Sequence, residues 1–275
     1  MRKAKDGSMV KRIIVLICTL IYLVPLYVVI VNSVKTDAEV ILSPLALPRE
    51  ITFDNFVFAF EASDMFTLYK NSIIITVCSV VLLIVISSTA AYVLARRTGK
   101  LYNCLYVFSL LGIMVPPVVT LIPSIQTLQF FGLLHTFPGM FLFYGGTFFS
   151  FAIFLYVNFI KTIPISFDEA ASIDGANQFA IFFKIILPLL RPCTVTVVIM
   201  LGMWIWNDFL NPMYILGTQG GLTITTGIHR AMGPFTARWN IVFANVILAS
   251  APVIIMYLCL QKHFMKGMAA GAIKG

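Results

Sequence analysis

Six long apolar stretches constrain the fold of this chain more than any other feature of its sequence. Each has about the length that a helix needs to cross the hydrocarbon core of a bilayer. The stretches cover, to within a few residues, 13–33, 72–95, 103–123, 138–160, 192–213 and 241–261. Only 11% of the 275 residues are charged and 60% are hydrophobic, which excludes an ordinary soluble domain. We therefore predict an all-α polytopic membrane protein with six transmembrane helices, folded as a single domain, 1–275.

The distribution of basic residues predicts the side of the membrane on which each loop lies. With the N-terminus inside, most of the 19 Lys and Arg residues fall in inside segments. The outside segments keep Lys35, Arg49, Lys70, Arg230 and Arg238. This bias follows the positive-inside rule, so both termini are predicted to be cytoplasmic, with the chain in the cytoplasmic (inner or plasma) membrane and in contact with lipid. The net charge of +8 is explained by topology, and no nucleic-acid partner is expected.

No pattern in the sequence indicates catalysis, a metal site or a cofactor. The five cysteines lie within predicted spans and the three histidines are scattered along the chain. The phosphate-binding pattern G-x-x-x-x-G-K-[ST] is absent from the sequence. We predict that the chain is not an enzyme and has no catalytic, cofactor-binding or metal-binding residue. If it transports a solute uphill, a partner must supply the energy.

The most distinctive segment outside the spans is the predicted cytoplasmic loop at residues 161–191. Ser166 is followed three residues later by Glu169, a spacing that is typical of a capping box at a helix start. Gly175 is placed to end this helix after about two turns, because glycine adopts the left-handed conformation of a helix C-cap without strain. The sequence therefore predicts a short, isolated helix in this loop.

A second short helix is predicted directly after the first. Asn177 is placed to cap it, and Pro188 is expected to stop it. Apolar residues recur between them at helical spacing: Phe179, Phe182, Phe183 and Ile186. Two capped helices in one loop indicate a surface that is presented to a partner; the alternative is a linker that only joins two spans.

The fifth apolar stretch carries the one charged side chain that is predicted to lie near membrane depth, Asp208. Asn207 and Asn211 accompany it. An acid at this depth is costly and is therefore a functional candidate. The three residues are predicted either to line a translocation path or to hydrogen-bond with neighbouring helices, and the sequence leaves both interpretations open.

Several residues are expected to interrupt helices within the spans: Pro116 and Pro117 in the third, Gly145 and Gly146 in the fourth, and Pro252 in the sixth. Kinked helices suit a translocation path that opens alternately to the two sides of the membrane, although kinks are common in any helical bundle. Outside the spans, the amphipathic stretch 53–60 is predicted to lie along the membrane surface. The glycine-rich segment 214–240 is predicted to be mainly loop.

Three segments resemble a known family. Glu169-Ala-Ala-Ser-Ile-Asp-Gly-Ala176 resembles the EAA loop of permease subunits in binding-protein-dependent ABC importers. Trp206-Asn-Asp-Phe-Leu-Asn-Pro212 is similar to the fifth-helix motif of carbohydrate permeases, and the ending, 264–275, is similar to the tail of the smaller maltose-type permease. The resemblance covers essentially the whole chain, with one conservative departure at Met268-Ala269.

The resemblance implies a type I ABC importer permease fold in which the loop at 161–191 is a coupling loop. Its first helix would enter a cleft on an ATPase subunit, with Glu169 making a polar contact and the small residues allowing a close fit. The implied ATPase-coupling residues are Glu169, Ala170, Ala171, Asp174, Gly175 and Ala176. The tail is implied to reach between ATPase subunits, or else it is a frayed terminus; its implied contacts are Gly267, Ala270, Gly271, Lys274 and Gly275.

The resemblance also implies partners and a substrate class. A second, different permease would complete the pore, two cytoplasmic ATP-binding subunits would drive it, and an extracytoplasmic solute-binding protein would deliver the substrate. That substrate would be a sugar or oligosaccharide, or alternatively a non-carbohydrate solute such as a glycerol-phosphate compound. Two interpretations outside the family are an ATP-independent transporter and a membrane enzyme acting through Asp168, Glu169 and Asp174, although no nucleophile or metal ligand accompanies these acids.

Overall fold

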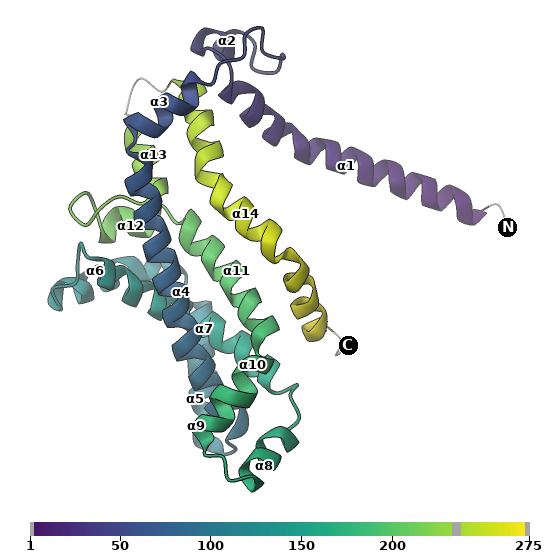
Figure 1. Ribbon diagram of the computed structural model, residues 1–275, viewed down its shortest axis with the longest axis vertical. Helices are drawn as coiled ribbons and strands as arrows, with labels where there is room; N and C mark the ends of the chain where they lie inside the picture. The colour runs from purple at the N-terminus through teal and green to yellow at the C-terminus, as the bar shows by residue number, and fades with distance from the viewer. Residues whose placement is uncertain (1–2, 233–237, 273–275) are drawn as a thin grey trace. The chain divides into compact units, whose positions relative to one another are not determined.

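The computed structural model describes residues 3–232 and 238–272, and all regular secondary structure in these residues is helical (Figure 1). The long helices are α1 (Lys3–Ser33), α4 (Met65–Arg96), α7 (Phe137–Ile160), α11 (Arg191–Asn207) and α14 (Trp239–Ala272). Those of intermediate length are α5 (Lys100–Met114) and α6 (Pro117–Phe130). The short ones are α2 (Asp37–Leu42), α3 (Asp54–Ala62), α8 (Ser166–Ile173), α9 (Gln178–Ile181), the π-helical turn η1 (Phe182–Ile186), α10 (Leu187–Leu189), α12 (Leu210–Ile215) and α13 (Ile224–Met232).

Within residues 3–232 and 238–272, four helices are long and apolar enough to cross a membrane, and two bent pairs raise the number to six if each pair is one span. The four are Lys11–Ser33, Met65–Arg96, Phe137–Ile160 and Trp239–Cys259. The bent pairs are Lys100–Met114 with Pro117–Phe130, at 105°, and Gln178–Leu189 with Arg191–Asn207, at 70°. The prediction of an all-α polytopic membrane protein is therefore confirmed, and the predicted kink at Pro116 and Pro117 is present as a sharp break.

The third and fifth predicted spans differ from straight helices for identifiable reasons. In the third, α5 ends before two consecutive prolines that have no N–H to continue its hydrogen bonds. In the fifth, α11 ends at Asn207 and α12 begins at Leu210, so Asp208 lies at a break. By contrast, α7 continues through Gly145 and Gly146, and α14 continues through Pro252. The interruptions that we predicted at these two places are absent.

The chain divides into two compact units. Unit 1 comprises Met1–Phe66 and Gly227–Pro252, and unit 2 comprises Thr67–Thr226 and Val253–Gly275. In unit 1, the apolar side chains of α1 are exposed from Ile13 to Tyr27, which suits a helix surrounded by lipid or by a partner. The predicted amphipathic stretch forms α3 in this unit, and the glycine-rich segment 214–240 contains α13 in addition to loop. The assignment of the whole chain to a single domain stays a prediction.

A buried polar network holds the connection that follows α1 in unit 1. Asn55 donates hydrogen bonds to the carbonyl oxygens of Ser33 and Lys35, both at 2.8 Å, and accepts one from Asn240 at 2.7 Å. The fully buried Lys35 ammonium donates to the carbonyl oxygens of Ser43 and Ala46 at 2.8 and 2.6 Å. These contacts satisfy a buried charge with backbone oxygens, so they fix the loop between α1 and α2.

The core of unit 2 is built around α7. Its fully buried residues include Tyr144, Tyr156 and Ile160, which pack with residues of α4, η1 and α11. Close approach of α5 to α7 depends on Gly112, because a Cβ there would overlap the hydroxyl of Ser150. The loop at 161–191 extends from the end of this core, with α8 at the lower end of the unit in Figure 1.

Candidate functional site

The coupling loop, residues 161–191, begins differently from the prediction. The helix α8 starts at Ser166, whose side chain makes no capping hydrogen bond, so the predicted capping box with Glu169 is wrong. The helix start is instead satisfied by backbone: the N–H groups of Asp168 and Glu169 both donate to the carbonyl oxygen of Ile165, at 2.9 and 3.1 Å. Ile165 itself has a helical conformation, which leaves no place for a side-chain cap at Ser166.

The end of α8 is the predicted glycine C-cap. Gly175 has φ +84°, the left-handed conformation that glycine adopts without strain. Its N–H donates to the carbonyl oxygen of Ser172 at 3.1 Å, and the N–H of Ala176 donates to that of Ala171 at 3.0 Å. This pair of bonds is the Schellman motif, which satisfies the last carbonyls of a helix. The geometry ends α8 after eight residues and sends the chain away from its axis.

The second helix of the loop starts as predicted and ends at Leu189, one residue beyond the predicted stop at Pro188. The Asn177 side chain accepts a hydrogen bond from the N–H of Ala180 at 2.9 Å, which caps α9. The helix then widens into η1, where the N–H of Leu187 donates to the carbonyl of Phe182. Pro188 lies within α10, and the helical path bends 70° into α11. A single π-helical turn inside an α-helix is uncommon and is frequent at functional sites.

An ion pair connects the coupling loop to the end of α4. The Arg96 guanidinium lies 2.9 Å from a carboxylate oxygen of Asp168, and each side chain is only 13% exposed. The two atoms are in ionic contact, although their angle is not that of a hydrogen bond. The Tyr92 hydroxyl, one helical turn earlier on α4, donates to the other Asp168 oxygen at 2.8 Å. We call Tyr92, Arg96 and Asp168 the loop anchor.

Arg96 also joins the loop anchor to the end of α7. Its guanidinium donates to the carbonyl oxygens of Ile163 and Ile160, at 3.1 and 3.4 Å. The Arg96 side chain, at the end of α4, therefore contacts both the C-terminal end of α7 and the first turn of α8. This role of Asp168 was not predicted from the sequence, where the acid was a candidate only in the membrane-enzyme alternative. The available signal was the four-residue spacing of Tyr92 and Arg96, which places both on one face of α4.

Most of the predicted coupling residues are exposed to solvent. Glu169, Ala170, Asp174 and Gly175 are exposed and Ala176 is half-buried, whereas Ala171 is buried within the chain's own core. Apolar side chains lie beside them on the surface: Ile173 is 86% exposed and Phe179 is 77% exposed. The loop thus combines an acid, small residues and two large apolar side chains on its outer surface. Their contact with an ATPase stays a prediction.

The polar residues of the fifth apolar stretch form a capped break. The Asp208 carboxylate accepts hydrogen bonds from the Tyr144 hydroxyl at 2.9 Å and from the Asn211 side chain at 2.7 Å. It also accepts the N–H of Asn211 at 3.3 Å, so it caps the start of α12. The exposed Asn207 donates to the carbonyl of Met203 on its own helix at 2.9 Å. These contacts favour the interpretation that Asp208 joins neighbouring helices; path-lining by the three residues stays a prediction.

The C-terminal tail is only partly described. Gly267, Ala270 and Gly271 lie in the backbone of α14, which continues to Ala272. Lys274 and Gly275 lie outside the described residues. The predicted contact of this tail with ATPase subunits stays a prediction.

The sequence matches a family of transport proteins. Residues 83–270 match the family described as binding-protein-dependent transport system inner membrane component. The chain is 34% identical over 276 residues to the probable starch degradation products transport system permease protein AmyC of Thermoanaerobacterium thermosulfurigenes, with 100% of both chains covered. It is 33% identical over 279 residues to the melibiose/raffinose/stachyose import permease protein MelC of Bacillus subtilis (strain 168), again with 100% of both covered.

The fold matches a solved transporter. A chain in the crystal structure of a bacterial ABC transporter involved in the import of the acidic polysaccharide alginate superposes with a TM-score of 0.86 and 23% sequence identity. The match covers 96% of this chain and 98% of that chain. The likeness confirms the predicted ABC importer permease fold.

Proposed function

This chain belongs to the family of binding-protein-dependent transport system inner membrane components, and from that premise we propose that it is a permease subunit of an ABC importer for a sugar or oligosaccharide. Family membership also confirms that the chain itself is not an enzyme. In the proposed assembly, a second, different permease completes the pore, two ATP-binding subunits act from the cytoplasm, and an extracytoplasmic solute-binding protein delivers the substrate. The carbohydrate class is supported by relatives whose names specify starch degradation products and melibiose, raffinose and stachyose.

The observation that carries the coupling role is the way in which α8 is built. It is a short helix, ended by its own Schellman motif and tied to α4 through Asp168. Such a helix moves as one body, so a displacement imposed on its outer surface is transmitted to α4 and α7 through Arg96. In this proposal, closure of the ATP-binding subunits displaces α8, and the permease turns outward by a rigid-body switch.

The exposed surface of α8 suits a small, reversible contact with an ATPase subunit. Glu169 offers a charge for a polar contact on the ATPase, while Ile173 and Phe179 offer apolar area. Exposed apolar side chains grouped beside a charge are typical of protein contact sites rather than of free loops. The residues proposed to couple are Glu169, Ala170, Asp174, Gly175 and Ala176, with Ala171 supporting α8 from the inside.

The experiment is mild-detergent purification of the tagged chain from its own membranes, followed by identification of every protein that co-purifies. We expect a second permease, an ATP-binding subunit and a solute-binding protein. Proteoliposomes of the assembly should then take up a neutral oligosaccharide only with ATP inside. Uptake of glycerol 3-phosphate but of no sugar would favour the non-carbohydrate alternative, and uptake without ATP would contradict the importer assignment.

A Glu169→Ala variant tests the coupling role within the same assembly. The account predicts normal insertion, with ATP-driven uptake at least about tenfold lower, because loss of one charge-assisted contact costs roughly 1.5–3 kcal/mol. Exposed Lys100, the first residue of α5 and outside the coupling loop, provides the control as Lys100→Ala, which should leave uptake unchanged.

A further inference from the structure

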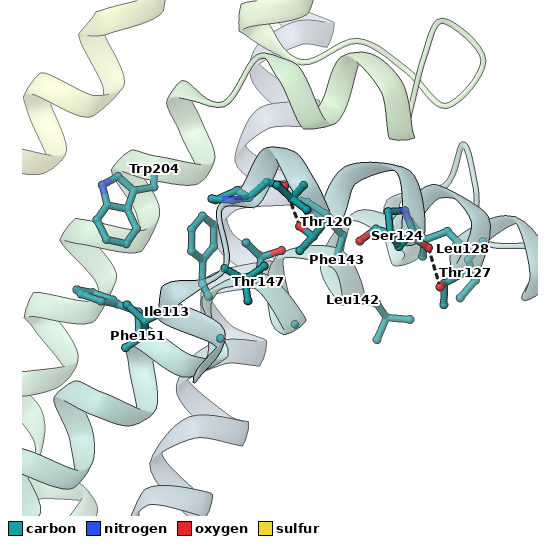
Figure 2. A pocket seen from close by; sticks show the side chains of 18 of the residues that line it. Ile113, Thr120, Ser124, Thr127, Leu128, Leu142, Phe143, Thr147, Phe151 and Trp204 are labelled. Atoms are coloured by element: carbon teal, nitrogen blue, oxygen red, sulfur yellow. Dashed lines mark hydrogen bonds between the residues drawn. The ribbon is translucent and has the colours of Figure 1, made fainter. Parts of the chain in front are cut away.

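A cavity of about 840 Å³ lies beside the break between α5 and α6 and is bordered by α7 and α11 (Figure 2). Its volume is in the range of small-molecule sites in proteins. No charged side chain is among the described residues that line it. A site of this kind suits a neutral ligand, because an ionic one would lose its hydration without gaining a counter-charge.

The break itself supplies hydrogen-bond acceptors at the cavity wall. A helical carbonyl is normally bonded by the N–H four residues later, but Pro116 and Pro117 have no N–H. The carbonyls of Gly112 and Ile113 therefore lack their helical donors, and both residues line the cavity. Interrupted helices at membrane depth are tolerated where they line a cavity, and transporters use them at substrate sites.

Three hydroxyl-bearing residues of α6 line the same cavity. Thr120 and Thr127 donate to the carbonyl oxygens of Pro117 and Pro123, each at 2.8 Å, which leaves their own oxygens free to accept (Figure 2). Ser124 lies between them on α6 and lines the cavity as well. The wall thus offers acceptors that match a ligand rich in hydroxyl donors.

An aromatic cluster forms the opposite part of the lining. The Trp204 ring packs against Phe151 and Phe148, with centroids 4.9 and 5.6 Å apart, and yet the residue is 42% exposed. In Figure 2, Trp204 and Phe151 lie across the cavity from Ser124 and Thr127. A pyranose ring has an apolar C–H face that stacks on such a ring while its hydroxyls hydrogen-bond at its edge.

We propose that this cavity is a contact site for a neutral saccharide, formed by this subunit itself. The sugar stacks on Trp204, and its hydroxyls donate to the oxygens of Ser124, Thr127 and the broken end of α5. A lipid chain, the other neutral occupant, would leave these oxygens without donors. This inference rests on the proposed carbohydrate transport, which it deepens by placing the substrate on this chain.

The first step of the test identifies the probe. Proteoliposomes of the complete transporter are offered raffinose, maltotriose and arabinotriose with ATP inside, and the sugar that enters is taken forward. If none enters, the proposed carbohydrate function fails and this inference fails with it. If one enters, the remaining steps test the cavity alone.

The second step measures binding to the full chain in lipid nanodiscs. Trp206→Phe and Trp239→Phe leave Trp204 as the one tryptophan, since the chain has three. We expect the transported sugar to change its fluorescence saturably, and glycerol 3-phosphate not to do so. Ser124→Ala should weaken this binding about threefold to tenfold, the loss of one hydrogen bond. Ser109→Ala is the matched control, because Ser109 is on α5 but outside the cavity, and it should bind normally.

The third step measures uptake by the complete transporter, so that the test does not depend on the isolated chain. Trp204→Ala should lower the maximal uptake rate about tenfold, while Trp204→Phe, which keeps an aromatic face, should restore most of it. Equal uptake by Trp204→Ala and wild type, or a sugar that is transported without any effect on Trp204 fluorescence, would overturn the inference and leave the proposed function intact.

Discussion

Two bent helix pairs in unit 2 have different surroundings. At the bend between α5 and α6, Val115 is exposed, α5 has no buried residue, and residues on both sides of the bend line a cavity. At the bend between α10 and α11, Leu190 is fully buried in the core. Both bends have prolines beside them. The difference lies in the packing, because the first bend is open and the second is filled.

Proline at a helix bend thus leads to two different local structures in this chain. Proline frees backbone groups at both bends, but the neighbouring helices decide whether the freed space becomes a cavity or a joint. The open bend leaves unpaired backbone carbonyls beside a cavity, whereas at the filled bend Leu190, between α10 and α11, is packed into the core. Four sets of variants test this difference.

The largest effect is expected from breaking the loop anchor, which ties the first turn of α8 to α4. Arg96→Ala leaves the Asp168 carboxylate buried without its cation, which in buried pairs costs about 3–5 kcal/mol. We expect ATP-driven uptake to fall more than tenfold in proteoliposomes, with ATP hydrolysis no longer stimulated by the solute-binding protein. The exposed neighbour Arg97 is the control, and Arg97→Ala should transport normally.

A second variant separates the role of charge from that of stability. Asp168→Asn keeps the size of the side chain and can still accept from Tyr92, so it should fold but weaken the tie to Arg96. Asp168→Asn leaves the Arg96 guanidinium buried without its carboxylate, which should lower the yield of folded protein. Adding Arg96→Gln removes that unpaired charge. The double variant should recover part of the yield without restoring the coupling of ATP hydrolysis to uptake. Full coupling in the double variant would show that the ion pair has no role in transmission.

An intermediate effect is expected at the two bends themselves. Leu190→Ala creates a void in the filled bend and should lower the free energy of unfolding by about 2–5 kcal/mol. Val115→Ala at the open bend should change it by less than about 0.5 kcal/mol, since its side chain is exposed. Denaturant titrations of the purified variants measure both values, and equal losses would contradict the distinction between the bends.

Effects smaller than that of Leu190→Ala are expected from two glycines. Gly175 needs its positive φ, so Gly175→Ala should cost about 1–2 kcal/mol and loosen the end of α8. Gly146 is in a helix beside the open bend, with no heavy atom within 4 Å of an added Cβ, and Gly146→Ala should stabilise by up to about 1 kcal/mol. Hydrogen exchange of the α8 amides checks the loosening in Gly175→Ala, and thermal unfolding measures the stability of both variants. A Gly175→Ala variant that is more stable than wild type would contradict the need for a positive φ at this position.

Local signals predicted much of the fold. Runs of apolar residues predicted the long helices, and glycine and asparagine at the right positions predicted the C-cap at Gly175 and the N-cap at Asn177. These features depend on a few neighbouring residues, which a sequence displays directly. The same local reasoning erred at Ser166, where backbone geometry at Ile165 made a side-chain cap unnecessary.

Long-range contacts could not be predicted in this way. The pairing of Arg96 with Asp168 joins residues that are far apart in sequence, and nothing local to either residue specifies its partner. The cavity likewise depends on how α6, α7 and α11 meet, although the two prolines that open it are evident in the sequence. For Asp208, the sequence drew attention to the charge, but it did not predict that the Tyr144 hydroxyl would be its hydrogen-bond donor.

The most direct test of the central claim is photo-crosslinking in native membranes from a photoreactive amino acid at Glu169. The position is exposed on α8, so the account predicts an adduct with an ATP-binding subunit that strengthens or weakens with nucleotide. The same probe at Leu42, an exposed position in unit 1 predicted to be extracytoplasmic, should give no such adduct. If Glu169 gives adducts only with lipid, or if both positions label the ATP-binding subunit equally, the coupling role of α8 is contradicted.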